Sequence, residues 1–486
     1  MMQSKSVIIP TAGGSPLETS CRTVVAGLTA AHSCVTRLRH SVRVRTSLAN
    51  AMYGIGDYVA QPVAMLLAAR FLLHRLGLSQ YGLWMLAAAA ISGASLVCTG
   101  FGDAALKYAS VYRGRENKAK LEQILRVNLT INLVLSCMLA ALIWCGAPLA
   151  ASNWFKIDVS LRAAATVAFR IGSAILVVRS IESVFVAALR AHERYGPSVQ
   201  ISVLSRIAIV ASACVLVSRG HGIVAIMAAT LALVTASAIL QITAAWMIIG
   251  PMSMVPAIAR NAFLEVFGFG CYSWLQAVAG CIFSQADRML IGVLLGTSAI
   301  ASYSVCIQAA QPIHGLIAAG LHFVFPHLSA RLSTAQVTEL KTVVRFIFWL
   351  NLALAVVLCV PFVLLSELLL RLWIGPAFAH QAWMVLSIIA AGFGLLGLNV
   401  TGHYALLALG QVRLVSLLNL AGGTAMLVAM ILLAPRFGLV GVAVGRLIYG
   451  PVTLLMYWHL RSLLSPGPSA HSEMPAPIVA GGLEAQ

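Results

Sequence analysis

Long apolar runs separated by short polar segments are the main feature of this sequence. From about residue 49 onward the charged residues are concentrated between the runs. A helix of about 20 apolar residues crosses the roughly 30 Å hydrocarbon core of a bilayer. The pattern therefore predicts an all-α polytopic membrane protein with about 12 transmembrane helices. The expected spans are 49–70, 82–104, 127–149, 163–189, 198–218, 222–248, 262–285, 300–325, 343–366, 380–409, 413–434 and 438–461.

The second half of the pattern repeats the first. An Arg, a Gly and a Tyr follow one another around the first loop of each half, and the two sets lie 218 to 222 residues apart: Arg70, Gly77 and Tyr81, then Arg288, Gly296 and Tyr303. A nearly constant offset indicates an internal duplication. It predicts two six-helix bundles, residues 48–250 and 251–464. Because six is an even number, both bundles enter the membrane in the same direction and are parallel repeats.

The distribution of charge predicts the orientation. The formal net charge is +18, yet only 9% of the residues are charged and 60% are apolar. With the N-terminus inside, 20 of the 32 Lys and Arg residues fall in inside segments and 8 in outside segments. This bias follows the positive-inside rule and places both termini in the cytoplasm. Nucleic acid is therefore not an expected partner. Residues 1–47 and 465–486 are polar and are expected to be disordered cytoplasmic tails.

The sequence contains no motif of a soluble catalytic site. A phosphate-binding loop, a His-Glu-x-x-His zinc motif and a nucleophile elbow are all missing from the chain. The ten cysteines lie mostly inside the spans without a Cys-x-x-Cys pair, which is typical of small buried apolar residues. We expect no enzyme activity, no cofactor and no metal.

Charged residues inside the spans are the candidates for function. Such residues are costly in lipid and usually face a cavity or a charged partner. The candidates within spans are Asp57, Asp103, Arg170, Arg179, Glu182, Arg206, Glu265 and Arg446, and Asp287 and Arg288 lie at a rim.

One ion pair is expected among these residues. Glu182 and Arg206 lie at equal depth, about 12 Å from the same membrane surface, on antiparallel neighbouring spans. Pairing them leaves Arg179, on the same helical face as Glu182, as an uncompensated cation. Arg170 lies nine residues from Arg179 and is therefore expected on the opposite face. For each charge, a helix-packing salt bridge or a side chain that reaches to the membrane surface is the alternative.

Three short motifs give the chain a family resemblance. They are Arg70…Leu76-Gly77…Tyr81-Gly82, Asp287-Arg288-Met-Leu-Ile-Gly292…Gly296…Tyr303 and Leu372-Trp373-Ile-Gly375. They resemble the Wzx-type polysaccharide flippases of the multidrug/oligosaccharidyl-lipid/polysaccharide exporter superfamily. The resemblance implies a MATE- and MurJ-like pair of bundles around a cavity that opens alternately to each side. It also implies cavity roles for Arg70 and Arg288.

The family's substrate is undecaprenyl-pyrophosphate-linked oligosaccharide, moved across the bacterial inner membrane for exopolysaccharide, O-antigen or capsule assembly. A guanidinium group suits this cargo because it stays charged and binds phosphate in a bidentate fork. We therefore expect a cationic cavity formed by Arg70, Arg170, Arg179, Arg206, Arg288 and Arg446. The acids Asp57, Glu182, Glu265 and Asp287 would have coupling or structural roles. Membrane lipid and a polysaccharide polymerase or export complex are the candidate partners.

Two other functions remain open. A cation-coupled multidrug exporter of the MATE type would need acidic residues in the membrane, and Asp57 and Glu265 lie early in the first span of each half. A membrane scaffold without transport activity would not need buried arginines. Transport of a cationic dye, compared with transport of a lipid-linked saccharide, separates the first alternative from a flippase.

Overall fold

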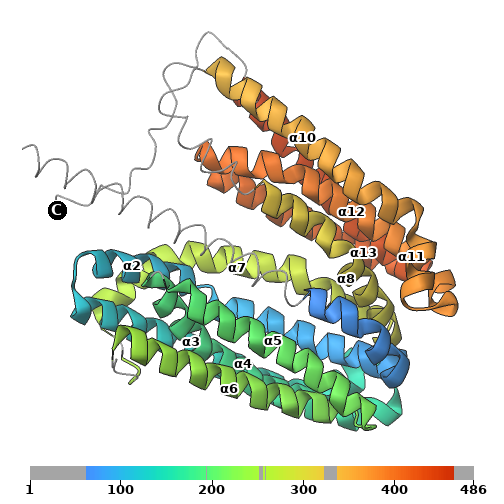
Figure 1. The fold of residues 1–486 in the computed structure, drawn as a ribbon, viewed down its shortest axis with the longest axis horizontal. Helices are drawn as coiled ribbons and strands as arrows, with labels where there is room; N and C mark the ends of the chain where they lie inside the picture. Colours follow the sequence, from blue (N-terminus) through green and yellow to red (C-terminus); the bar gives the residue numbers. More distant parts are fainter. Residues whose placement is uncertain (1–61, 193, 251–254, 258, 322–336, 465–486) are drawn as a thin grey trace, which may run out of the picture. The chain divides into compact units, whose positions relative to one another are not determined.

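The computed structural model describes residues 62–192, 194–250, 255–257, 259–321 and 337–464. Asp57 and both predicted tails lie outside these residues. Throughout the described part, regular structure is helical and no strand occurs (Figure 1). The all-α fold class is therefore confirmed.

Among the described residues, the first half forms six helices and two short helical turns. After the helix Pro62–Thr99 come α2 (Gly102–Gly114), α3 (Lys118–Leu149), a π-helical turn (Ala150–Trp154), a 3-10 turn (Val159–Leu161), α4 (Arg162–Ala191), α5 (Tyr195–Ser218) and α6 (Ile223–Ile249). α4 packs between α3 and α6, and α5 packs against α6.

The second half repeats this order. Its helices are α7 (Arg260–Leu294), α8 (Thr297–Gly320), α10 (Val337–Leu364), α11 (Ser366–Trp373), α12 (Pro376–Ala408), α13 (Val412–Leu447), α14 (Tyr449–Leu454) and α15 (Met456–Leu463). α12 packs against α8, α10, α11 and α13. The sequence α10–α11–α12 has the same form as α3, the π-helical turn and α4, namely a long helix, a short helical segment and a second long helix.

Eight helical segments of the described chain are long and apolar enough to cross a membrane. Arg413–Leu463 contains two expected spans, and Pro62–Thr99 contains parts of two. Pro62–Thr99 changes direction at Gly77 (φ 76°), and Arg413–Leu463 changes direction at Gly438 (φ 57°). With α7 and α8, this arrangement agrees with about twelve transmembrane helices.

Left-handed glycines occur at turns on both ends of the helices, and four of them define one end. Because successive long helices run in opposite directions, the turns at Gly77, Gly220, Gly296 and Gly438 fall at a common end, which we call the glycine-turn end. All four glycines have positive φ, a conformation that strains other residues. Gly77 and Gly296 lie 219 residues apart, and Gly220 and Gly438 lie 218 apart, which supports the duplication.

The structure corrects several expected span boundaries. Residues 71–76 are helical rather than loop, α7 continues nine residues beyond the expected end at 285, and α2 extends to Gly114. Hydropathy records where the chain leaves the hydrocarbon core, whereas a helix continues until a residue such as glycine ends it. The expected loops were therefore too long.

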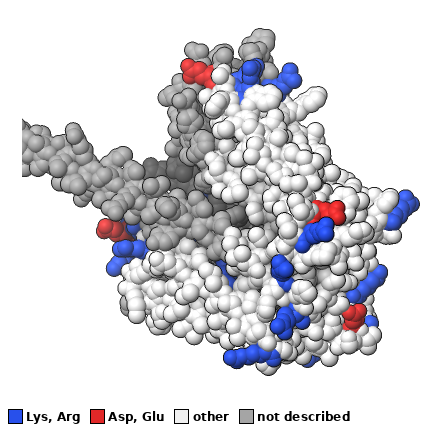
Figure 2. All heavy atoms as spheres, turned by 45° about the vertical axis from the view of Figure 1, so that its right-hand side comes forward, with Lys and Arg blue, Asp and Glu red and all other residues white. Residues whose placement is uncertain are grey.

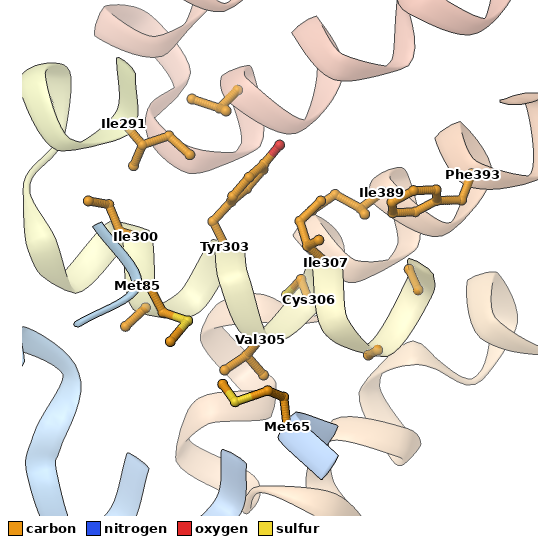
Figure 3. Close-up of a cluster of buried hydrophobic side chains, with 14 of the residues drawn as sticks. Met65, Met85, Ile291, Ile300, Tyr303, Val305, Cys306, Ile307, Ile389 and Phe393 are labelled. Atoms are coloured by element: carbon orange, nitrogen blue, oxygen red, sulfur yellow. The ribbon is translucent and has the colours of Figure 1, made fainter. Parts of the chain in front are cut away.

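The main hydrophobic core joins the two halves near the start of α8. Tyr303, Val305 and Cys306 of α8 are fully buried, and Met65 and Met85 of the helix Pro62–Thr99 lie in the same cluster (Figure 3). On the face shown in Figure 2, Lys and Arg are gathered in limited areas, and much of the remaining surface is uncharged.

Candidate functional site

A buried cluster of polar and aromatic side chains links four helices of the second half. Asp287 of α7 is 2% exposed and accepts hydrogen bonds from the hydroxyl of Tyr303, at 2.7 Å, and from the guanidinium of Arg446. Arg446, on α13, also donates to the Tyr303 oxygen at 3.2 Å. Its guanidinium lies 5.2 Å from the centre of the Phe393 ring on α12. The cluster therefore ties α7, α8, α12 and α13 together.

This arrangement gives Arg446 a carboxylate partner within the protein. A buried ion pair is tolerated only when further hydrogen bonds satisfy its polar atoms, and here the Tyr303 hydroxyl contacts both charges. Figure 3 shows Tyr303 with its ring near Ile291 and Ile300 and its hydroxyl directed away from Val305. We had expected Arg446 and Asp287 in separate roles, and the structure brings them together.

Arg288, the residue after Asp287, has different surroundings. Its backbone N–H donates to the Asp287 carboxylate at 2.7 Å, and its guanidinium donates to the side-chain oxygen of Gln285 at 3.2 Å. The Nε atom is buried and has no hydrogen-bond partner among the described residues. Adjacent residues on a helix point about 100° apart, so Asp287 can pair with Arg446 while Arg288 faces elsewhere. Arg288 thus has no acidic partner in the described chain.

Contacts between the two halves lie close to Arg288. The hydroxyl of Tyr81, from the first half, donates to the amide oxygen of Gln308 on α8 at 3.4 Å, and both residues are buried. Gln285, which accepts from the Arg288 guanidinium, packs against the first half, since a Cβ added at Gly93 would lie 3.6 Å from the Gln285 Cβ. At Gly82 a side chain would overlap the backbone carbonyl of Thr297, so the two halves approach each other at backbone distance.

Two further contacts join the halves at the glycine-turn end. The ammonium group of Lys156 donates to the Leu294 carbonyl at 2.7 Å. Arg70 is exposed and its guanidinium donates to the Leu372 carbonyl at 3.4 Å. Arg70 and Arg288 were both assigned to the cavity from the resemblance, and both lie where the first half meets the second.

The structure changes the expected pairing of Glu182. Its carboxylate lies 3.6 Å from the guanidinium of Arg179, one turn away on α4, and accepts a hydrogen bond from the hydroxyl of Ser237 on α6. The expectation that Arg179 is an uncompensated cation is therefore wrong, because residues three apart on a helix already lie side by side. A Glu182–Arg206 pair stays a prediction.

The remaining candidates lie apart from these clusters. Glu265 accepts a hydrogen bond from the hydroxyl of Tyr112 at 2.8 Å, which links α7 to α2 toward the other end of the helices. Arg170 lies over the ring of Trp144 on α3. The six arginines expected in one cavity therefore lie at several separate positions in the structure. No group of three or more His, Cys, Asp and Glu residues that could hold a metal occurs within the described ranges.

Comparison with known proteins identifies the family. A family profile described as "Polysaccharide biosynthesis protein" matches residues 76–337, which is more than half of the chain. The chain belongs to the polysaccharide biosynthesis protein family. This result confirms the resemblance to the Wzx-type flippases that the three motifs suggested.

Relatives of this family member include two named transporters. An O-antigen transporter of Shigella flexneri is 21% identical over 403 residues, which cover 81% of this chain and 93% of the relative. A low-salt glycan biosynthesis flippase of Haloferax volcanii is 21% identical over 290 residues, which cover 59% of each chain. The chain is thus similar to membrane transporters of polysaccharide biosynthesis.

Solved structures agree on the fold. The lipid II flippase MurJ in an inward closed conformation superposes with a TM-score of 0.69 at 14% identity, covering 84% of this chain and 87% of MurJ. An inward-facing multidrug transporter of the MATE family gives a TM-score of 0.61 at 16% identity, covering 85% and 94%. At these identities the likeness establishes the fold of the superfamily and leaves the cargo to other arguments.

Proposed function

We propose that this protein moves undecaprenyl-pyrophosphate-linked oligosaccharide units from the cytoplasmic to the periplasmic leaflet of a bacterial inner membrane. Both termini would lie in the cytoplasm, and the glycine-turn end would face the periplasm. Family membership and the named relatives support a polysaccharide flippase. The pyrophosphate is an anion that cannot cross about 30 Å of hydrocarbon without a polar path.

The observation that carries the proposal is the position of Arg288. Asp287 is engaged by Arg446 and Tyr303, so the Asp-Arg sequence leaves the second residue as a net cation beside the junction of the two halves. Arg70 adds a second guanidinium at the rim of the same junction. A guanidinium offers two parallel N–H groups to a phosphate, which suits a pyrophosphate better than a sugar or an organic cation.

The contacts between the halves suggest which movement transport requires. The Tyr81–Gln308 hydrogen bond and the close approach at Gly82 hold the halves together at the glycine-turn end. In alternating access, each bundle rocks about a shared site. We propose that these contacts separate when the cavity opens toward the periplasm, and that the pyrophosphate then passes from Arg288 to Arg70.

Other candidate cations have secondary roles in this proposal. The Arg179 side chain is 33% exposed although it pairs with Glu182, which is 7% exposed, so Arg179 can contact an anion without losing its partner. Arg206 would assist it. Arg446 would act through Asp287 as a positioning residue, and polymerase or export proteins would receive the product.

The test is complementation of a flippase-null strain. Surface polymer is measured and corrected for the amount of protein. We expect activity to decrease in the order wild type, Arg288→Lys, Arg288→Ala, because Lys keeps the charge but loses the bidentate fork. Arg75→Ala is the matched control, since Arg75 is an exposed arginine near the same end.

Two outcomes would contradict the proposal. Wild-type polymer levels in Arg288→Ala cells would remove the cation from the mechanism. Export of a cationic dye by the purified protein, without transport of lipid-linked saccharide, would favour the MATE-type alternative.

A further inference from the structure

The first half carries a cation that is separate from the junction of the bundles. Arg170, on α4, is half-buried, and its Nε atom is shielded from solvent without a hydrogen-bond partner in the part of the chain that the structure describes. The guanidinium carbon lies 5.3 Å from the centre of the Trp144 ring on α3. Trp144 is itself 50% exposed. No carboxylate of the described residues pairs with Arg170.

Arg170 lies on the outward side of α4. Gly172, about 200° further around the helix, faces Ile91 and Met227 so closely that a side chain there would overlap Ile91. Arg170 therefore points away from the helices against which Gly172 packs. Val167 shares the side of Arg170 and is 41% exposed.

The neighbouring surface of α3 is suited to lipid. Cys137, Ala141 and Pro148 lie within about 60° of Trp144 around α3, and all three are exposed. An exposed side of a transmembrane helix that carries only apolar residues indicates contact with acyl chains. The guanidinium of Arg170 therefore lies beside lipid.

A cation beside lipid needs an anionic partner. An arginine in a transmembrane helix is costly unless it pairs or reaches the membrane surface. Arg170 lies eight residues, or about 12 Å, from the start of α4 at Arg162. Arg162, Thr166 and Arg170 are spaced by four residues and form a polar stripe that leads from the glycine-turn end into the membrane. A long arginine side chain can extend along such a stripe toward the headgroups.

We propose that Arg170 and Trp144 form a lateral binding site for the phosphate of an anionic membrane phospholipid, in the leaflet at the glycine-turn end. The phosphate accepts hydrogen bonds from the Arg170 fork, while the Trp144 ring covers the other face of the guanidinium. The acyl chains then lie along the exposed apolar residues of α3. This site does not rest on flippase activity and needs only that α3 and α4 cross a bilayer.

The test uses quenching of tryptophan fluorescence in the purified full-length protein. Phosphatidylglycerol or phosphatidylcholine with brominated acyl chains is added to detergent micelles. The chain has nine tryptophans, so the contribution of Trp144 is taken as the difference between wild type and Trp144→Phe. We expect phosphatidylglycerol to quench this contribution at a roughly tenfold lower mole fraction than phosphatidylcholine, because the choline cation of phosphatidylcholine offsets the charge of its phosphate and weakens the bond to Arg170.

Three variants locate the preference. In Arg170→Gln, the Trp144 contribution is the difference from Arg170→Gln/Trp144→Phe, and both lipids should quench it equally. In Arg170→Lys, part of the preference for phosphatidylglycerol should remain. Arg219→Gln, which removes an exposed arginine at the same end of the neighbouring α5, should keep all of it. If Arg170→Lys keeps part of the lipid preference and Arg170→Gln loses it, the loss is due to binding and not to misfolding.

Several results would overturn the proposal. One is equal quenching of wild-type Trp144 by the two lipids, and another is an unchanged preference in Arg170→Gln. Inorganic phosphate that abolishes the preference at millimolar concentration would indicate a free-anion site instead. Displacement by a polyprenyl phosphate, with no response to phosphatidylglycerol, would assign the site to the carrier lipid of the transport substrate.

Discussion

Removing Arg446 should destabilise the second half by more than the loss of the Arg446 contacts alone, because it leaves the Asp287 carboxylate buried without a cation. Asp287 is 2% exposed and Arg446 is the cation that contacts its carboxylate, with Tyr303 as the other side-chain donor. In Arg446→Leu the carboxylate would remain in the protein interior with two neutral donors, the Tyr303 hydroxyl and the Arg288 backbone N–H, and no cation. Breaking a buried pair in this way costs about 3–5 kcal/mol.

A double-mutant cycle separates this penalty from general damage to packing. Asp287→Asn/Arg446→Leu leaves no unpaired charge, and the Asn oxygen can still accept from Tyr303. We expect the double variant to recover at least half of the stability lost in Arg446→Leu, with a coupling energy of about 1–3 kcal/mol. The measurement is the fraction of detergent-solubilised protein that remains monodisperse in increasing denaturant. Arg436→Leu, at an exposed position on α13, is the control and should change little.

The reasoning fails if the two substitutions are additive within about 0.5 kcal/mol. Additivity would mean that Arg446 and Asp287 are stabilised independently. Arg446 would then be available to the transported anion, as the sequence alone had suggested.

The remaining predictions concern topology and the junction of the halves. Reporter fusions after Lys118 and after Lys156 should report cytoplasm and periplasm respectively, and the reverse result would invert the orientation. Gly82→Ala should lower protein abundance or transport, because the new methyl group overlaps a carbonyl of α8 and overpacking costs about 1–3 kcal/mol. Gly146→Ala on α3, where a side chain meets open space, is the control; equal effects in the two variants would show that close approach at Gly82 is unimportant.

The sequence by itself determined the membrane-spanning helices, their approximate number and the duplication. These features depend on local quantities, namely the length of an apolar run and the positions of glycines that alone adopt positive φ without strain. Gly77 and Gly296 were found by their spacing, and the structure places both at turns of the same kind. The family followed from the same short motifs.

Only the tertiary structure decided which charges meet. The sequence showed that Asp287 and Arg288 are adjacent, but adjacent helical residues diverge, so the partner of Asp287 had to come from elsewhere in the fold. That partner is Arg446, 159 residues away in the chain. The pairing of Arg179 with Glu182 was accessible from their spacing of three, and the equal depth of Arg206 directed attention away from it. Depth and spacing restrict the possible partners, whereas the rotation of each helix about its axis, which packing sets, selects among them.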